Sequence, residues 1–171
     1  TRTKDGGKSW SFLSWIGPEP SGFSIMPSTV RLSSTRLLTT VRRKEGQNHW
    51  IEAWHSNDFG ESWDYLNRPV DSTGGSVGNP PSLIELQDGR LVLTYGFRSE
   101  PLGIRARLSD DRGQNWGEEI ILRDDAGCWD LGYPRSVQRE DGRIVTIYYF
   151  NDQADSERYI AATIWDPDQS D

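Results

Sequence analysis

Hydrophobic residues in this chain fall into short runs that alternate with polar residues, and no stretch repeats apolar residues at helical spacing. The clearest unit lies in the middle of the chain, where β-forming residues fill several such runs. Asp88-Gly89 separates the first two runs and predicts a hairpin turn, because glycine adopts positive φ without strain. The predicted strands cover about residues 82–86, 90–96, 103–108 and 117–122. The pattern therefore predicts an all-β chain.

One eight-residue motif occurs three times at a constant period. It reads Ser/Thr-x-Asp-x-Gly-x-x-Trp and covers residues 3–10, 56–63 and 109–116. Its aspartates, Asp5, Asp58 and Asp111, are separated by 53 residues in both intervals. A constant spacing of this kind indicates an internal structural repeat.

The motif has a structural role within a β-hairpin. Its Asp and Ser/Thr oxygens accept backbone N–H groups, its glycine takes positive φ, and its tryptophan packs against the turn. The tryptophans are Trp10, Trp63 and Trp116. We therefore interpret Asp5, Asp58 and Asp111 as structural residues and not as catalytic carboxylates.

The repeat continues outside the motif. Residues 81–92 match residues 134–145, again 53 positions apart, and a weaker copy begins at Pro27. Four antiparallel strands in each unit of about 50 residues are typical of the blades of a β-propeller. We predict one partial propeller domain over residues 1–171, with repeats at approximately 1–17, 18–70, 71–123 and 124–171.

Composition excludes several classes of protein. The 171 residues carry a net charge of −7, which argues against nonspecific binding to nucleic-acid phosphates. The single Cys128 excludes an intrachain disulfide and a cysteine-based zinc site. No third metal ligand stands near His49 and His55, so we expect no metal and no cofactor. No apolar run is long enough to span a membrane. We expect a secreted or periplasmic protein, although no signal peptide opens the chain at Thr1.

The repeated motif is the Asp box, or BNR repeat, and the chain resembles the C-terminal portion of the sialidase superfamily over nearly its whole length. The resemblance implies a six-bladed propeller, of which about three blades are present here. It also implies an exo-acting glycosidase with three arginines that bind the sugar carboxylate, a tyrosine nucleophile assisted by a glutamate, and an aspartate acid/base. Other glycoside hydrolases, polysaccharide lyases and noncatalytic binding proteins share the motif.

Blade geometry limits where a functional site lies. Because the strands alternate in direction, the Asp-Gly turns and the Asp boxes share one face of the propeller. The loops between second and third strands and the crossings between blades share the other face, and such loops commonly carry function. This loop face holds the candidate polar residues Arg42, Arg43, His49, Arg98, Asp124, Asp125, Asp130, Tyr133, Asn151 and Asp152.

Tyr133 is the leading catalytic candidate. The stretch 131–137, followed by Asp141-Gly142 and Tyr148-Tyr149, resembles the sialidase segment around the tyrosine nucleophile. A tyrosine hydroxyl needs a neighbouring carboxylate to accept its proton, and a neutral phenol suits an anionic sugar. The chain departs from the family pattern at Pro134, which replaces a serine, and near residues 79–81, where the family's glutamate has no counterpart.

Three arginines are candidates for binding the carboxylate of an acidic sugar. Arg98 ends a predicted second strand, Arg43 holds nearly the same position one blade earlier, and Arg135 points inward from an innermost strand. A planar guanidinium binds a carboxylate through two parallel hydrogen bonds. In the crossing loop that precedes Tyr133, Asp130 is the candidate acid/base, and Trp129 is a candidate for stacking on a sugar ring.

These observations predict a sialidase-like glycoside hydrolase that acts on terminal acidic sugars of glycans. Two alternatives stay open: a noncatalytic carbohydrate-binding propeller and a propeller lyase that cleaves uronic-acid polymers. About three blades cannot close a ring that usually needs roughly four to eight. Either blades that precede Thr1 complete the propeller, and this piece is inactive by itself, or two copies of the chain assemble.

Overall fold

The computed structural model describes residues 1–168, which form eleven β-strands and no helix. The strands are β1 (Phe23–Arg31), β2 (Leu37–Glu45), β3 (Asn48–Ser56), β4 (Asp64–Val70), β5 (Ser82–Glu85), β6 (Leu91–Phe97), β7 (Gly103–Ser109), β8 (Ile120–Arg123), β9 (Gly132–Gln138), β10 (Ile144–Phe150) and β11 (Tyr159–Trp165). Within the described part of the chain, no helix is long and apolar enough to cross a membrane.

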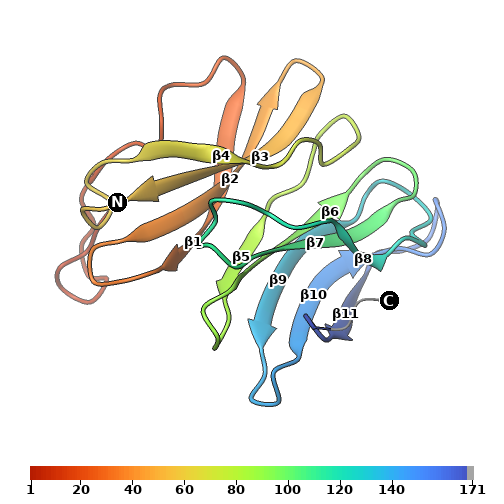
Figure 1. The fold of residues 1–171 in the computed structure, drawn as a ribbon. Helices are drawn as coiled ribbons and strands as arrows, with labels where there is room; N and C mark the ends of the chain where they lie inside the picture. The colour runs from red at the N-terminus through yellow and green to blue at the C-terminus, as the bar shows by residue number, and fades with distance from the viewer. Residues whose placement is uncertain (169–171) are drawn as a thin grey trace.

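The strands form three antiparallel sheets that follow one another across the molecule (Figure 1). The first two sheets contain β1–β4 and β5–β8 in chain order, and the third contains β9–β11. The first strands of the sheets lie side by side, since β5 contacts both β1 and β9. This is the arrangement of propeller blades around an axis, so the predicted all-β propeller and its count of about three blades are confirmed.

The strands of the middle sheet agree with the sequence prediction, apart from the start of the last one. Gly89 adopts a φ of 88° in the predicted turn between β5 and β6. Strand β8 begins at Ile120 rather than at Gly117, whose N–H donates to the Leu108 carbonyl at 2.8 Å. The third sheet differs from a four-stranded blade, since residues 124–168 contain three strands. The Asp-box motif, which lies between the third and fourth strands of the first two sheets, does not occur in residues 124–168.

The hydrophobic core lies between neighbouring sheets. Leu38 and Ile51 of the first sheet pack with Leu91, Leu93 and Tyr95 of the second, and all five are fully buried. A second cluster joins the second and third sheets and contains Leu102, Ile104, Leu131, Tyr148 and Phe150. Full burial of one such side chain contributes about 1.5–3 kcal/mol, so these contacts hold the blades together.

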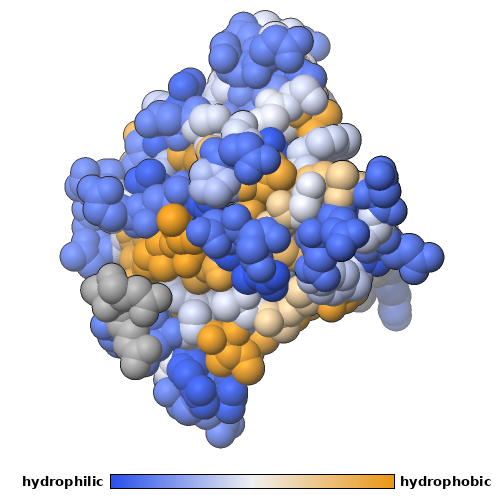
Figure 2. Space-filling view, turned by 90° about the vertical axis from the view of Figure 1, so that its right-hand side faces the viewer, coloured by the Kyte–Doolittle hydropathy of each residue, from blue (hydrophilic) through white to orange (hydrophobic). Residues whose placement is uncertain are grey.

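The face of the third sheet that points away from the second sheet is apolar and uncovered. Leu91 of β6 pairs with Ser109 of β7, and the equivalent Ile144 of β10 pairs with Trp165 of β11. Ile160 and Ile164 on β11 therefore occupy the positions that Ile104 and Leu108 hold on β7. Ile104 is fully buried, whereas Ile160 is 75% exposed. Figure 2 views this side of the molecule and shows hydrophobic areas among polar ones. The side chains fit a surface that a further blade would cover.

The Asp-box aspartates bond within their own turns. One carboxylate oxygen of Asp58 accepts the Ser56 hydroxyl at 2.8 Å and the Ser62 N–H at 2.9 Å, and the other accepts the Ser62 hydroxyl at 2.6 Å. These bonds, led by those from Ser62, lower the pKa of Asp58 to about 2. Asp5 and Asp111 make equivalent bonds. Their lone pairs are therefore engaged in holding the turns.

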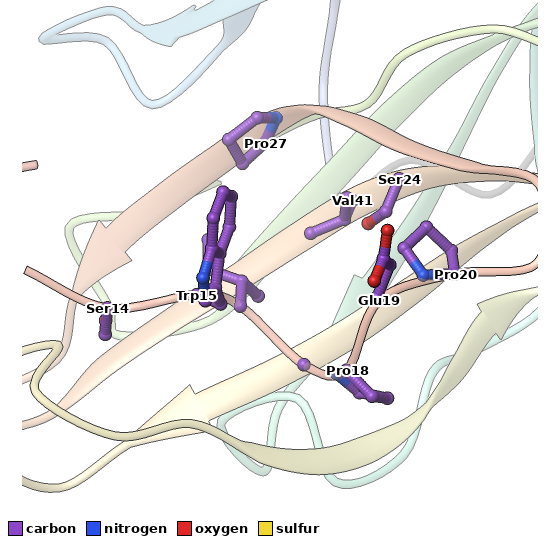
Figure 3. A pocket seen from close by; sticks show the side chains of 10 residues that line it. Ser14, Trp15, Pro18, Glu19, Pro20, Ser24, Pro27 and Val41 are labelled. Atoms are coloured by element: carbon purple, nitrogen blue, oxygen red, sulfur yellow. The ribbon is translucent and has the colours of Figure 1, made fainter. Parts of the chain in front are cut away.

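Residues 1–22 lie against the outer side of the first sheet and leave a cavity of 580 Å³ beside it (Figure 3). Trp15 extends toward Pro27 of β1 across this cavity, and Val41 of β2 lies at its floor. Trp15 is 80% exposed. None of the predicted catalytic or substrate-binding residues is among those that line the cavity.

Candidate functional site

A cluster of polar and aromatic side chains gathers where the second strands of all three blades end. Arg42 lies near the end of β2, Arg98 directly follows β6, and Tyr149 lies near the end of β10. Tyr133, near the start of β9, and Asp130, in the loop before β9, complete the cluster. Antiparallel strands in successive blades bring these positions to the predicted loop face. We call these five residues the loop-face cluster.

Arg98 is held from several directions. Its Nη1 donates to the Gly78 carbonyl at 2.9 Å, while Nε and Nη2 donate to the Leu131 carbonyl at 3.1 and 2.8 Å. Nη2 also donates to the Tyr149 hydroxyl at 2.7 Å. The residue is only 5% exposed, and this burial, together with the nearby charge of Arg42, lowers its pKa. The guanidinium is therefore fixed in orientation.

Arg42 reaches from the first blade to the third. Its Nη1 donates to the Tyr133 hydroxyl at 3.4 Å, and its Nη2 donates to the Val77 carbonyl. Its Nε is buried and has no hydrogen-bond partner among residues 1–168. Val77 lies in the crossing loop between the first and second blades. In this loop Lys44 also donates to the Ser76 carbonyl at 3.2 Å, and Arg98 donates to the Gly78 carbonyl, so three consecutive carbonyls each accept a bond from a cation. The loop thus positions both arginines.

Neither Arg42 nor Arg98 has a carboxylate partner among the described residues. Within residues 1–168, the ion pairs involve nine other arginine–carboxylate combinations. Arg42 and Arg98 are nevertheless 6% and 5% exposed. Buried charges in proteins are ordinarily paired, so two buried guanidinium groups without an ion pair among the described residues distinguish this cluster from the other charged residues of the loop face.

Asp130 and Tyr149 form the second half of the cluster. Tyr149 donates its hydroxyl to Asp130 Oδ1 at 2.7 Å, and Arg158 donates to Asp130 Oδ2 at 3.1 Å. The bond from Tyr149 is the main cause of the lowered pKa of Asp130, and Arg158 adds to it. Burial and the same bond to Asp130 raise the pKa of Tyr149. Asp130 is therefore an ionised carboxylate at neutral pH.

Tyr133 is the accessible phenol of the cluster. Its side chain is 40% exposed, and its ring lies 5.8 Å from the ring of Tyr149. Its hydroxyl accepts the bond from Arg42, and no described residue accepts a hydrogen bond from it. The backbone has a φ of 52°, a left-handed conformation that is rare for an aromatic residue. Such strain often accompanies a functional position.

The structure brings some of the predicted substrate-binding residues into this cluster and leaves others outside. Trp129 joins it, 52% exposed, with its ring centroid 5.6 Å from Cζ of Arg98. Arg43 does not join it, because it lies on the opposite face of β2 and pairs with Glu52 at 3.3 Å. Arg135 is exposed on the uncovered face of the third sheet and bonds only the Pro134 carbonyl. Arg42 lies where we expected Arg43.

The register of the second strands explains this difference. Arg31 pairs with Leu37 in the first blade, and Glu85 pairs with Leu91 in the second, an offset of 54 rather than 53 residues. Lys44, not Arg43, therefore corresponds to Arg98. An offset of 53 would instead match Arg98 with Glu45, which shares a strand face with Arg43, whereas Lys44 shares a face with Arg42. Since neighbouring strand residues point to opposite faces, this one residue of register places Arg42 and not Arg43 on the side of Arg98. Tyr149 was not assigned a role from sequence, and its only signal is its place in the Tyr148-Tyr149 pair.

Comparisons with solved structures agree with the propeller fold. A protein of unknown function from Dyadobacter fermentans shares 28% identity over 95% of this chain and 43% of its own, with a TM-score of 0.76. A GH93 α-L-arabinofuranosidase of Fusarium graminearum shares 20% identity over 94% of this chain and 51% of its own, with a TM-score of 0.68.

A more distant structure is a Hadza microbial sialidase, with 18% identity over 84% of this chain and 35% of its own, and a TM-score of 0.59. The chain thus spans about half or less of each of these proteins. A search of curated proteins found no match. The family model of the BNR repeat-like domain matches residues 1–146, and the chain belongs to this family.

Proposed function

We propose that the protein containing this chain is a carbohydrate-active enzyme, a sialidase-like glycoside hydrolase that acts on terminal acidic sugars of glycans. The observation that carries the proposal is the pair Arg42 and Arg98, two buried guanidinium groups without a carboxylate partner. Structural relatives with the same fold include an α-L-arabinofuranosidase and a sialidase, which support a glycan as the substrate. A glycan substrate also suits a secreted or periplasmic protein.

The two arginines would hold the carboxylate of the sugar. Hydrogen bonds to charged groups contribute roughly 1.5–3 kcal/mol each, and those between a guanidinium and a carboxylate are among the strongest. The Gly78 and Leu131 carbonyls already orient Arg98, so little side-chain entropy is lost on binding. Trp129, beside Arg98, would pack against the sugar ring.

Tyr133 is the residue that we assign to attack. Its oxygen would form a bond to the anomeric carbon while the bond from that carbon to the leaving oxygen breaks, and water would later release the sugar. Arg42, which donates to this oxygen, would stabilise the charge that develops there. Tyr149 is less suited to attack, because its hydroxyl already accepts from Arg98 and donates to Asp130.

Two further groups would transfer protons, one as the base for the phenol and one as the acid for the leaving oxygen. Asp130 is ionised at neutral pH, which suits a base and not an acid. It accepts from Tyr149 and not from Tyr133, so the Tyr149 hydroxyl would pass its own proton to Asp130 and take the proton of Tyr133. We therefore assign the acid that protonates the leaving oxygen to the part of the propeller outside residues 1–168. This agrees with the share of the solved relatives that the chain spans. The described residues alone would bind a sugar without cleaving it.

The test is turnover of two fluorogenic substrates by the full-length protein: an acidic sialoside and a neutral α-L-arabinofuranoside. We expect hydrolysis of the sialoside, a loss of at least about 100-fold in Tyr133→Phe, and a raised KM in Arg98→Lys, which keeps the charge but loses the planar guanidinium. Arg43→Gln serves as the control. Equal cleavage of both substrates, or wild-type turnover by Tyr133→Phe, would contradict the proposal. Sialoside binding without turnover would identify a noncatalytic binding protein.

A uronic-acid lyase is the second candidate, and one observation favours it. The Tyr133 hydroxyl is paired with a guanidinium and not with a carboxylate. In a lyase, Tyr133 would remove the proton next to a carboxylate that Arg42 and Arg98 neutralise, and the leaving oxygen would depart as a carbon–carbon double bond forms. The product absorbs ultraviolet light. Absorbance that rises on incubation with a polyuronate, without hydrolysis of the sialoside, would establish this alternative.

A further inference from the structure

We infer that Asn79 is a positioning residue for the reaction at Tyr133: its buried amide holds the left-handed backbone of Tyr133 and the carbonyl that orients Arg98. Asn79 lies in the crossing loop between the first and second blades and is fully buried. Its amide bonds backbone groups at the blade boundary. The inference rests on the proposed function, because it assigns the reacting oxygen to Tyr133.

Asn79 uses both ends of its amide to connect two blades. Its Oδ1 accepts the backbone N–H of Tyr133 at 3.1 Å and that of Gly96 at 3.3 Å. Its Nδ2 donates to the Leu131 carbonyl at 2.9 Å. The N–H of Gly96 belongs to the second blade, while the other two groups begin the third. One side chain therefore ties the start of β9 to the end of β6.

The left-handed conformation of Tyr133 requires an interaction that holds its backbone in place. A tyrosine with φ of 52° brings its Cβ close to its own backbone, and such residues persist only where the surroundings determine them. The hydrogen bond from its N–H to Asn79 fixes this peptide plane. The conformation in turn directs the side chain toward Arg42, since the Tyr133 hydroxyl accepts from Arg42 at 3.4 Å.

The surroundings of Asn79 are shaped to admit this side chain. A Cβ placed on Gly132 would lie 2.2 Å from Asn79 Nδ2, and a Cβ on Gly96 would lie 2.7 Å from the same amide. Both glycines are therefore required for the amide to enter between the strands. The site is built around a side chain of this size, which a longer or branched one would not fit.

Asn79 and Arg98 donate hydrogen bonds to the same carbonyl oxygen. The Leu131 carbonyl oxygen accepts Nδ2 of Asn79 together with Nε and Nη2 of Arg98. Arg98 keeps two bonds to this oxygen and one to Gly78 when Asn79 is removed. Loss of the Asn79 amide should therefore displace Tyr133 more than it displaces Arg98. The substitution should lower kcat, which depends on Tyr133, more than it changes KM, which depends on carboxylate binding.

The experiment compares Asn79→Ala with Asn67→Ala in the full-length protein. Asn67 is a matched control, because its Nδ2 also donates across a blade boundary, to the carbonyls of Gly113 and Gln114 at 2.7 and 2.9 Å. We expect Asn79→Ala to lower kcat on an acidic substrate about 10- to 100-fold and to change KM less than about threefold, since small misplacements of a reacting group cost this much. Asn67→Ala should leave kcat within about twofold.

A double-mutant cycle separates positioning from general loss of stability. If Asn79 acts through Tyr133, Asn79→Ala should cause no further loss of kcat in the Tyr133→Phe background. An equal fold-loss in both backgrounds, or equal losses in Asn79→Ala and Asn67→Ala, would overturn the inference. A wild-type rate for Tyr133→Phe would instead overturn the assignment of Tyr133 in the proposed function.

A crystal structure of Asn79→Ala provides a readout that does not depend on activity. We expect the Tyr133 backbone to leave the left-handed region and its hydroxyl to separate from Arg42. A Tyr133 φ that stays near the value of 52° found here would show that Asn79 does not hold this conformation.

Discussion

Arg42 and Arg43 are adjacent in β2 and point to opposite sides of the first blade. Arg42 reaches Tyr133 in the third blade, with 3.4 Å between Nη1 and the phenol oxygen, whereas Arg43 pairs with Glu52 at 3.3 Å inside its own sheet. Two residues of the same type, one position apart, thus belong to different environments. One faces the proposed site, and the other helps to pack the outer side of the blade beside Trp50.

Substitution of these neighbours should therefore affect ligand binding differently. Arg42→Gln should weaken the binding of a free acidic sugar to the full-length protein by about 10- to 100-fold, because a charge-assisted hydrogen bond is lost. Arg43→Gln should change the affinity less than about threefold and act mainly on stability, since it leaves Glu52 without its cation. Calorimetric titration measures both effects. Equal weakening in the two variants would contradict the assignment of Arg42.

Tyr149→Phe should reduce the sensitivity of the protein to acid. Tyr149 is the main cause of the lowered pKa of Asp130, and a folded-state pKa below the unfolded one stabilises the protein above about pH 4. That stabilisation is lost as the pH falls through the lowered folded-state pKa. The variant should thus be less stable at pH 6, and its stability should fall less between pH 6 and pH 3.

Urea midpoints at the two pH values measure this difference. Asp130→Asn supplies the control background, in which the carboxylate no longer titrates. Addition of Tyr149→Phe to that background should leave the change between pH 6 and pH 3 as it was. A further change there would show that another group carries the effect.

Gly132→Ala should destabilise the protein much more than Gly89→Ala. Both glycines have positive φ, 114° and 88°, so both substitutions carry the conformational cost of about 1 kcal/mol. A Cβ on Gly89 meets no atom within 4 Å, whereas one on Gly132 would lie 2.2 Å from Asn79. Chemical denaturation of both variants should show an additional loss of at least about 2 kcal/mol for Gly132→Ala. Similar values would show that the start of β9 can move away.

Ile160→Asp should have opposite consequences in the isolated chain and in the full-length protein. Ile160 is 75% exposed here, so in the 171-residue chain the substitution should change stability by less than about 0.5 kcal/mol and reduce self-association. If a further blade covers the third sheet, the same aspartate is buried without a partner, and the full-length protein should lose at least about 2 kcal/mol. Light scattering and urea denaturation measure the two effects. A harmless Ile160→Asp in the full-length protein would exclude such coverage.

The all-β propeller fold could be predicted from the sequence, because the signals that define it are local and repeated. Asp5, Asp58 and Asp111 recur at 53 residues, and the hydrogen bonds around each aspartate lie within five residues of it. Turn chemistry of this kind needs no distant partner, so strand order and blade number follow from it. The same pattern placed Arg98, Tyr133, Asp130 and Trp129 on one loop face.

Which side chains on that face contact one another depends on the packing between blades. The choice between Arg42 and Arg43 depends on one residue of register, and the repeat period along the chain does not resolve it. The contacts of Arg42 with Tyr133 and of Asn79 with Tyr133 join residues 91 and 54 positions apart. They exist because three blades pack around one axis, and packing between blades is set by all the buried side chains together and by no local motif.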